Sequence, residues 1–178
     1  MISNDVTNHG EISHINLKSG HICKVNTSDL ILLDGYEWKY WTGKRGSRDG
    51  EHVRAWIWEC KRMSLIHRFI MGITDPKIQV DHRNGSKLDN TRDNLRVCTG
   101  TQNQGNIGLR SDNKSGYRGV SWKKSNNKWT AQFNTKVNGI KMTKYLGLFE
   151  NKEDAASAYD TYARNYFGEE FARLNNCQ

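Results

Sequence analysis

The residues best placed to do chemistry lie in one stretch, residues 78–106, which reads IQVDHRNGSKLDNTRDNLRVCTGTQNQGN. It contains a carboxylate at Asp81, an imidazole at His82 and an amide at Asn103. Carboxylate and amide oxygens are hard ligands that suit Mg²⁺ or Mn²⁺, and an ion held by two protein groups keeps positions for water and phosphate oxygens. An imidazole with an ordinary pKa of about 6.5 can take a proton from water near neutral pH. The stretch therefore indicates metal-assisted hydrolysis.

Two strands and a helix must position these groups. Residues 78–80 are predicted to form a strand that ends in the Asp-His pair, and residues 94–99 a second strand. Turn-forming Asn-Gly and Asp-Asn pairs lie between them. Thr99 or Thr101 can cap a short helix that contains Asn103. A helix packed back across this hairpin would bring Asn103 close to the end of the first strand.

Many of these residues occur at the spacing of one enzyme family. The matching segments are Val80-Asp81-His82, Asn84-Gly85, Leu88-Asp89-Asn90, Asn94-Leu95-Arg96, Thr99, Asn103 and Asn106, preceded by His67-Arg68-Phe69-Ile70-Met71-Gly72. They resemble the HNH nucleases of the His-Me finger superfamily, specifically the phage and intron-encoded homing endonucleases. The resemblance covers roughly residues 30–106.

The resemblance implies a role for each matching residue. Asp81 would be a metal ligand and His82 the general base. Asn94 would orient that histidine by bonding to nearby backbone, and Asn103 would be the second metal ligand. The family's final histidine is replaced by Asn103, a weaker neutral ligand, which predicts looser metal binding. The single Mg²⁺ or Mn²⁺ would stabilise negative charge on the scissile phosphate.

Composition favours a partner with many negative charges. Lysine and arginine total 27 against 19 acids, so the net charge is +8 and the pI is about 9.4. No apolar run approaches the roughly 18 residues that span a bilayer, and the polar start MISNDVTNHG predicts no signal peptide. The four cysteines form no CxxC pair, which argues against a zinc site and a disulfide framework. Reduced thiols fit the cytoplasm of a bacterial or phage-infected cell.

The amino-terminal part is predicted to be rich in short strands, with a turn of helix after Ser28. Residues 36–42 and 52–58 read as a hairpin, and residues 60–74 as a helix with an apolar stripe. Basic residues and tryptophans mix in this hairpin, a pattern that can lie against a phosphate backbone or enter a groove. We expect Trp38, Trp56 and Trp58 to be core residues, and Lys44, Arg45 and Arg48 to contact DNA.

The carboxy-terminal part has a regular pattern after a polar linker, residues 108–116. Three strands are predicted, at residues 120–122, 129–137 and 140–146, with an Asn-Gly hairpin signal between the last two. Residues 152–167 are predicted to form a helix that covers the sheet, capped by Asn151 and ended by Gly168.

This part also resembles a known DNA-binding domain. The matching segments are Tyr117-Arg118-Gly119-Val120, Lys128-Trp129, Tyr145-Leu146-Gly147, Phe149, Ala155-Ala156, Ala158-Tyr159-Asp160 and Leu174-Asn175. They resemble the plant ethylene-response-factor (Apetala-type) domain over about residues 116–175, which implies a sheet laid into the DNA major groove. The expected DNA contacts are Arg118, Ser121, Lys123, Lys128, Gln132, Asn134, Thr143 and Tyr145. Several family arginines are replaced here, and Gln132 and Asn134 have the amide chemistry that reads adenine.

The sequence as a whole predicts an α+β protein: an HNH ββα-metal nuclease module plus a three-stranded antiparallel sheet packed on one helix. The expected domains are residues 1–107 and 117–178, joined by the linker. The predicted function is site-directed hydrolysis of double-stranded DNA, with no membrane or small-molecule partner. A single active site per chain makes a nick the natural product of a monomer. The alternative is a sequence-specific DNA-binding protein whose nuclease site is inactive; a membrane-surface or RNA-binding protein rests on charge alone.

Overall fold

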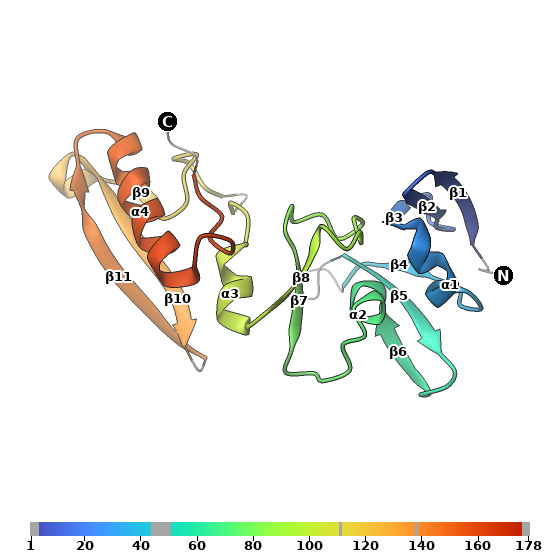
Figure 1. Cartoon of the computed structure of the whole chain (residues 1–178). Coiled ribbons are helices and arrows are strands. Elements are labelled where there is room, and N and C mark those ends of the chain that lie inside the picture. Colours follow the sequence, from blue (N-terminus) through green and yellow to red (C-terminus); the bar gives the residue numbers. More distant parts are fainter. Residues whose placement is uncertain (1–3, 44–50, 111, 138, 176–178) are drawn as a thin grey trace. The chain divides into compact units, whose positions relative to one another are not determined.

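The computed structural model describes residues 4–43, 51–110, 112–137 and 139–175. Its contacts divide the chain into two compact units, one that runs up to Val97 and one that starts at Cys98. Small sheets and short helices make up both units, which confirms the mixed class of the fold (Figure 1). Among the helices described, none is long and apolar enough to cross a membrane.

The first unit begins with a three-stranded antiparallel sheet. Its strands are β1 (Asp5–His9), β2 (Ile12–Asn16) and β3 (Ile22–Asn26), in that order, followed by the 3-10 helix η1 (Thr27–Asp29) and by α1 (Leu30–Leu33). Side chains on successive strand positions face opposite sides of the sheet, so Ile15, Cys23 and Val25 are fully buried. The predicted strands and the helical turn after Ser28 are confirmed.

The second sheet of this unit includes a strand where the sequence predicts a helix. It contains β4 (Lys39–Trp41), β5 (His52–Ile57) and β6 (Arg62–Leu65), and α2 (Ile66–Ile70) follows directly. The predicted hairpin is confirmed, but the helix expected over residues 60–74 is present only at residues 66–70. Residues 62–65 instead pair with β5, where Ser64 lies opposite Ala55. The pairing gives the backbone of β5 a hydrogen-bonded neighbour, which outweighs the helical spacing of the apolar residues.

One apolar core joins these elements to the stretch with the candidate site. Trp38 is fully buried, and its Nε1 donates to the Leu33 carbonyl oxygen at 3.2 Å. The same cluster of buried side chains includes Ile15 from the first sheet and both Val80 and Leu95 from the site stretch. The amino-terminal sheets therefore form part of the support on which the site rests.

The site stretch folds as a two-stranded sheet, β7 (Gln79–His82) and β8 (Leu95–Cys98). The loop between them is tied to the first sheet, because the Lys24 nitrogen donates to the Leu88 oxygen at 2.7 Å and the Asn90 nitrogen donates to the Lys24 oxygen at 2.8 Å. The element that follows is α3 (Gly100–Gly105), so the predicted order of strand, strand and helix is present. Packing of that helix across the hairpin remains a prediction.

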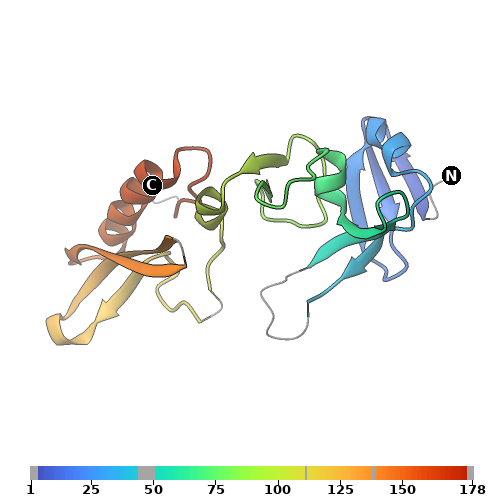
Figure 2. The same ribbon diagram turned by 90° about the horizontal axis from the view of Figure 1, so that it is seen from below.

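The second unit is a three-stranded antiparallel sheet covered by one helix. It contains α3, β9 (Val120–Lys123), the 3-10 helix η2 (Lys124–Asn126), β10 (Lys128–Val137), β11 (Ile140–Phe149) and α4 (Lys152–Phe167), with the sheet order β11-β10-β9. Figures 1 and 2 show α4 lying along one face of the sheet. Asn151 caps this helix by accepting from the Asp154 nitrogen at 2.8 Å, and Gly168 ends it with φ at +87°. These predictions are confirmed.

Candidate active site

Asp81 and His82, the expected metal ligand and general base, are both buried at the end of β7. They have 2% and 0% of their surfaces exposed. The Nε2 atom of His82 lies 3.1 Å from Oδ1 of Asn90, and its ring meets the edge of the His67 ring at a centroid distance of 5.0 Å. Burial lowers the pKa of His82 to about 4 and that of His67 to about 3. The ordinary pKa expected from the sequence is therefore corrected, and the His82 ring is neutral at pH 7.

Asp81 has a close charged partner on the neighbouring strand. Arg96 of β8 donates from Nη2 to Asp81 Oδ2 at 2.7 Å and from Nε to the same oxygen at 3.0 Å. The two side chains are only 3% and 7% exposed, so this is a buried ion pair. Because taking two charges out of water is costly, such a pair persists only with good geometry. The sequence pattern contained Arg96 but did not indicate this contact.

Asn94 closes the loop between the two strands. Its Oδ1 accepts from the Asn84 nitrogen at 3.0 Å, and its Nδ2 donates to the Asp89 carbonyl oxygen at 2.6 Å. Its own carbonyl oxygen accepts from the Arg83 nitrogen at 2.8 Å. These bonds to backbone fix the segment that directly follows His82, which is the kind of contact that the expected orienting role requires.

The helix that contains Asn103, α3, belongs to the second unit and packs against other parts of it. Thr99 caps α3 by accepting from the Gln102 nitrogen at 3.2 Å, in a capping box with the Gln102 side chain. The Gln104 side chain pairs with both backbone groups of Lys136 on β10, at 3.1 and 3.3 Å. A side chain at Gly105 would collide with the Phe171 oxygen, since a Cβ there would lie 2.5 Å away. Asp81 and Asn103 thus belong to different compact units, and their meeting at one metal ion stays a prediction.

The donor chemistry can be tested against the metal that the resemblance implies. Within the described ranges there is no cluster of three or more His, Cys, Asp or Glu side chains suited to a metal ion. One carboxylate and one amide still suit a hard cation that keeps most of its ligands as water or phosphate. The residues therefore fit Mg²⁺ or Mn²⁺ by donor type, although Arg96 already neutralises the carboxylate of Asp81.

Most of the residues expected to contact DNA share one face of the second sheet. Strand pairing places Ser121 opposite Thr130, Gln132 opposite Tyr145 and Asn134 opposite Thr143. Residues of the alternate positions, Ala131 and Phe133, are instead buried with α4 in the core. The face turned away from α4 presents Ser121, Lys123, Lys128, Gln132, Asn134, Thr143 and Tyr145. Of these residues, Ser121, Lys123, Asn134, Thr143 and Tyr145 are exposed. They form a surface that a nucleic acid can approach.

Two contacts on this face involve side chains that are expected to bind DNA. The Thr143 hydroxyl donates to Asn134 Oδ1 at 2.7 Å, so one of the two groups that would recognise adenine already has a neighbour. The Lys128 ammonium lies 2.7 Å from Glu150, at an exposed position where such a pair contributes little to stability.

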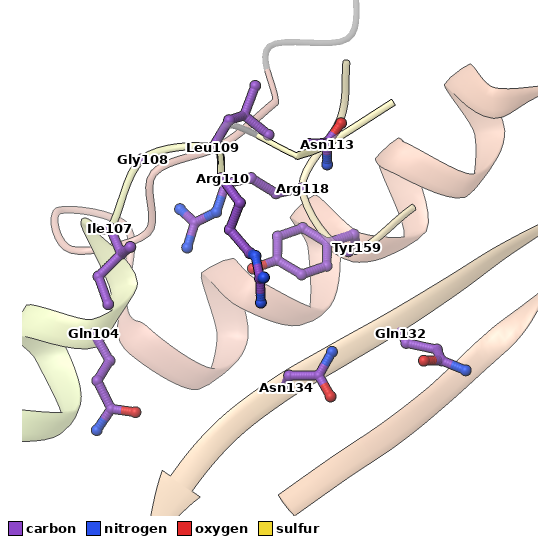
Figure 3. Close-up of a pocket in the computed structure, with 11 residues that line it drawn as sticks. Gln104, Ile107, Gly108, Leu109, Arg110, Asn113, Arg118, Gln132, Asn134 and Tyr159 are labelled. Carbon is purple, nitrogen blue, oxygen red and sulfur yellow. The ribbon is translucent and has the colours of Figure 1, made fainter. Parts of the chain in front are cut away.

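Arg118 stands apart from the other expected contacts. Its Nη1 donates to the carbonyl oxygens of Gly105 and Arg173, both at 2.8 Å, and its guanidinium lies 5.8 Å from the centre of the Tyr159 ring. Arg118 lines a hollow of about 220 Å³ together with residues of α3, the segment after it, β10 and α4. Figure 3 shows its side chain there. These bonds give Arg118 a structural task in joining α3 to the carboxy-terminal segment, and its contact with DNA remains a prediction.

The amino-terminal hairpin departs from the expectation for its tryptophans. Trp38 is a core residue, but Trp56 and Trp58 are 42% and 72% exposed and meet edge to face at 6.2 Å. The core assignment is therefore wrong for both, because β5 turns Val53, Ala55 and Ile57 inward and leaves the alternate positions outside. The Arg54 guanidinium stacks 4.2 Å above the Trp41 ring on the same strand pair. Lys44, Arg45 and Arg48 lie outside the described residues.

Comparison with known proteins supports both resemblances. A family model described as an HNH endonuclease matches residues 66–104, and one described as an AP2 domain matches residues 115–169. The chain therefore carries an HNH endonuclease domain followed by an AP2 domain. An uncharacterised HNH endonuclease of Acanthamoeba polyphaga mimivirus is 37% identical over 115 residues, which cover 62% of this chain and 56% of the viral protein. The chain thus spans little more than half the length of that relative. No solved structure gave a significant match.

Two residues near His82 were not singled out for a role by the sequence alone. Asn90 was recognised only as a turn former and part of the family pattern, and Cys23 had no role assigned. Asn90 is fully buried and touches both His82 and Cys23. The sequence around Asn90, Leu-Asp-Asn, predicts only a turn. Its contacts with His82 and Cys23 depend on the fold and have no local sequence signal.

Proposed function

We propose that this protein is a site-directed DNA endonuclease of the homing type, in which the HNH domain hydrolyses a phosphodiester bond and the AP2 domain binds the target. The observation that carries the proposal is the buried His82 imidazole, held by Asn90 beside Asp81 inside the segment that matches the HNH model. Groups whose pKa values are shifted by burial, as that of His82 is, gather at functional sites.

The residues of the chain have distinct tasks in this proposal. Because burial keeps the pKa of His82 at about 4, its ring has an unprotonated nitrogen at neutral pH that can accept a proton from water. Asn94 fixes the loop that follows the histidine. Asp81 and Asn103 would hold one Mg²⁺ or Mn²⁺, which when bound stabilises negative charge on the phosphate.

The AP2 domain would supply most of the affinity for double-stranded DNA. Its sheet face away from α4 carries Lys123, Lys128 and the amides of Gln132 and Asn134, and the whole chain has a net charge of +8. Cationic side chains on such a surface release counterions from the phosphate backbone, so binding should weaken as salt rises. The amides of Gln132 and Asn134 would add the choice of base.

A second candidate function is a sequence-specific DNA-binding protein whose nuclease site is inactive. The observation in its favour is the buried ion pair of Asp81 with Arg96, which engages the carboxylate that a metal would need. In this alternative the AP2 domain carries the function and the HNH domain is a scaffold.

Supercoiled plasmid distinguishes the two functions. The protein is incubated with plasmid and either Mg²⁺ or Mn²⁺, with a matched reaction that contains EDTA. The endonuclease proposal expects nicked circles with metal and none with EDTA, since a chain with one site cuts one strand at a time. Plasmid that stays supercoiled with every metal, while a gel-shift assay shows binding, would establish the DNA-binding protein instead. Mapping the cut ends on a genomic library then tests whether cleavage is site-directed.

A further inference from the structure

Asn90 makes a specific contact with the histidine of the proposed active site. Both side chains are fully buried, and the Asn90 Oδ1 atom lies 3.1 Å from His82 Nε2. We infer that Asn90 is a positioning residue, which accepts a hydrogen bond from Nε2 and holds the His82 ring in one tautomer and one orientation. Its effect on cleavage rests on the function proposed above, whereas its effect on the tautomer does not.

The orientation of the Asn90 amide follows from its other contacts. Its Nδ2 lies 3.1 Å from the carbonyl oxygen of Lys87, which can only accept a hydrogen bond. The same nitrogen lies 3.3 Å from the Sγ atom of Cys23. The nitrogen of the amide must therefore face Lys87 and Cys23, so the oxygen faces the imidazole. An amide with its two ends reversed would place two acceptors against each other at Lys87.

This orientation decides which ring nitrogen carries the proton. Because the Asn90 oxygen is an acceptor, the His82 Nε2 atom must be the donor. A neutral imidazole has a single N–H group, so Nδ1 is then the nitrogen with the lone pair. Asn90 thereby acts on the same ring as a base-orienting residue does in other hydrolases, in which the partner of one nitrogen sets the chemistry of the other.

The support for Asn90 comes from the amino-terminal sheet. The backbone nitrogen of Asn90 donates to the Lys24 oxygen at 2.8 Å, and Asp89 forms a parallel bridge with Lys24. Cys23 and Val25 of β3 are part of the buried core. A strand far away in the sequence thus fixes the position of Asn90, which gives the amino-terminal sheet a task in aligning His82.

Nitrogen NMR of the histidine side chains tests the inference. The chain has six histidines, and a His82→Gln variant identifies the signals of His82 in the ¹⁵N-labelled protein. The expected result for the native protein at neutral pH is a single tautomer with the proton on Nε2. A proton on Nδ1, or an even mixture of the two tautomers, would overturn the inference whether or not the protein cleaves DNA.

Substitution of Asn90 provides a second test, in which the His82 tautomer, plasmid nicking and DNA affinity are measured. Asn90→Leu removes the acceptor and should give a mixture of tautomers, with plasmid nicking slower on the order of 10²-fold and unchanged DNA affinity. The matched control is Asn84→Ala, which loses a 2.7 Å hydrogen bond to Asp89 in the same loop but leaves the contact of Asn90 with His82 in place. That control should keep the native tautomer.

The outcomes separate this inference from the proposed function. If the native protein shows the Nε2–H tautomer but does not nick plasmid, the contact stands and the nuclease proposal fails. If it nicks plasmid and Asn90→Leu neither changes the tautomer nor slows nicking, Asn90 has no positioning role. Should Asn90→Leu fail to fold, the tautomer of the native protein still decides the matter.

Discussion

The carboxylate of Asp81 and the guanidinium of Arg96 form an ion pair at 2.7 Å with almost no exposure to solvent. The two residues lie on the paired strands β7 and β8, so the pair links the strands across the centre of the candidate site. A carboxylate in this setting needs a positive partner, whether a guanidinium or a bound cation, because an uncompensated buried charge is costly.

Replacement of Arg96 by methionine should therefore destabilise the protein. The Arg96→Met variant leaves Asp81 buried without its cation, which should lower the free energy of unfolding by about 3–5 kcal/mol in metal-free buffer. Urea unfolding followed by circular dichroism measures the change. The control is Arg110→Met, which breaks an exposed pair with Asp112 and should change stability by less than about 1 kcal/mol. Equal stability of Arg96→Met and the native protein would contradict the buried pair.

The two buried histidines predict a loss of stability in mild acid. Burial lowers the pKa of His67 to about 3 and that of His82 to about 4, below the ordinary value of about 6.5 that both have when unfolded. As the pH falls below about 6.5, the unfolded chain binds protons that the folded chain does not. The free energy of unfolding should then fall by up to about 1.4 kcal/mol per pH unit for each histidine.

Urea midpoints at pH 7.5, 6 and 5 measure this slope. Carboxylates titrate in the same direction, so the variant His67→Phe supplies the comparison: without that imidazole, the slope between pH 6 and 5 should be smaller by the share of one histidine. Identical slopes for the variant and the native protein would show that His67 is not buried in its neutral form.

Two tryptophans of the amino-terminal hairpin region, Trp38 and Trp58, should contribute unequally to stability. Trp38 is fully buried and donates to the Leu33 oxygen, so Trp38→Ala should cost about 3–5 kcal/mol. Trp58 is 72% exposed, so Trp58→Ala should change stability by less than about 0.5 kcal/mol. Thermal unfolding of both variants checks the contrast. A large loss for Trp58→Ala would mean that the ring is covered in solution.

The sheet face of the AP2 domain predicts a change in salt dependence. Lys123 lies on the face turned away from α4, and Lys123→Ala should flatten the log–log plot of DNA affinity against salt by about one unit per lost phosphate contact. Fluorescence anisotropy at several salt concentrations gives the slope. Lys152 begins α4, on the other side of the sheet, so Lys152→Ala should leave the slope as it is. A slope change for Lys152→Ala and none for Lys123→Ala would place the DNA on the opposite face.

Local signals predicted the second unit well. The strands, the helix over residues 152–167 and its caps at Asn151 and Gly168 follow from alternation, helical spacing and cap chemistry, all of which act between near neighbours in the sequence. The same holds for the cap of α3, because Thr99 is one of the two threonines expected there and its partner Gln102 is three positions away.

Contacts between segments that are distant in the sequence could not be predicted from it. Residues 62–65 have apolar spacing that suits a helix, and only the presence of β5 beside them makes them a strand. The exposure of Trp56 and Trp58 depends on which side of β5 the core lies. Nothing local shows that Asp81 meets Arg96, or that Cys23 lies against Asn90. The depressed pKa of His82 likewise results from burial, which is a property of the whole fold.

The most direct test of the account is plasmid nicking by the His82→Ala variant, measured together with its affinity for the same DNA. If His82 is the base that takes the proton from water, the variant should lose nicking in Mg²⁺ or Mn²⁺, by at least about 10²-fold, while it binds DNA as the native protein does. A His82→Ala variant that folds and nicks plasmid at the native rate would contradict the account and remove this histidine from the mechanism.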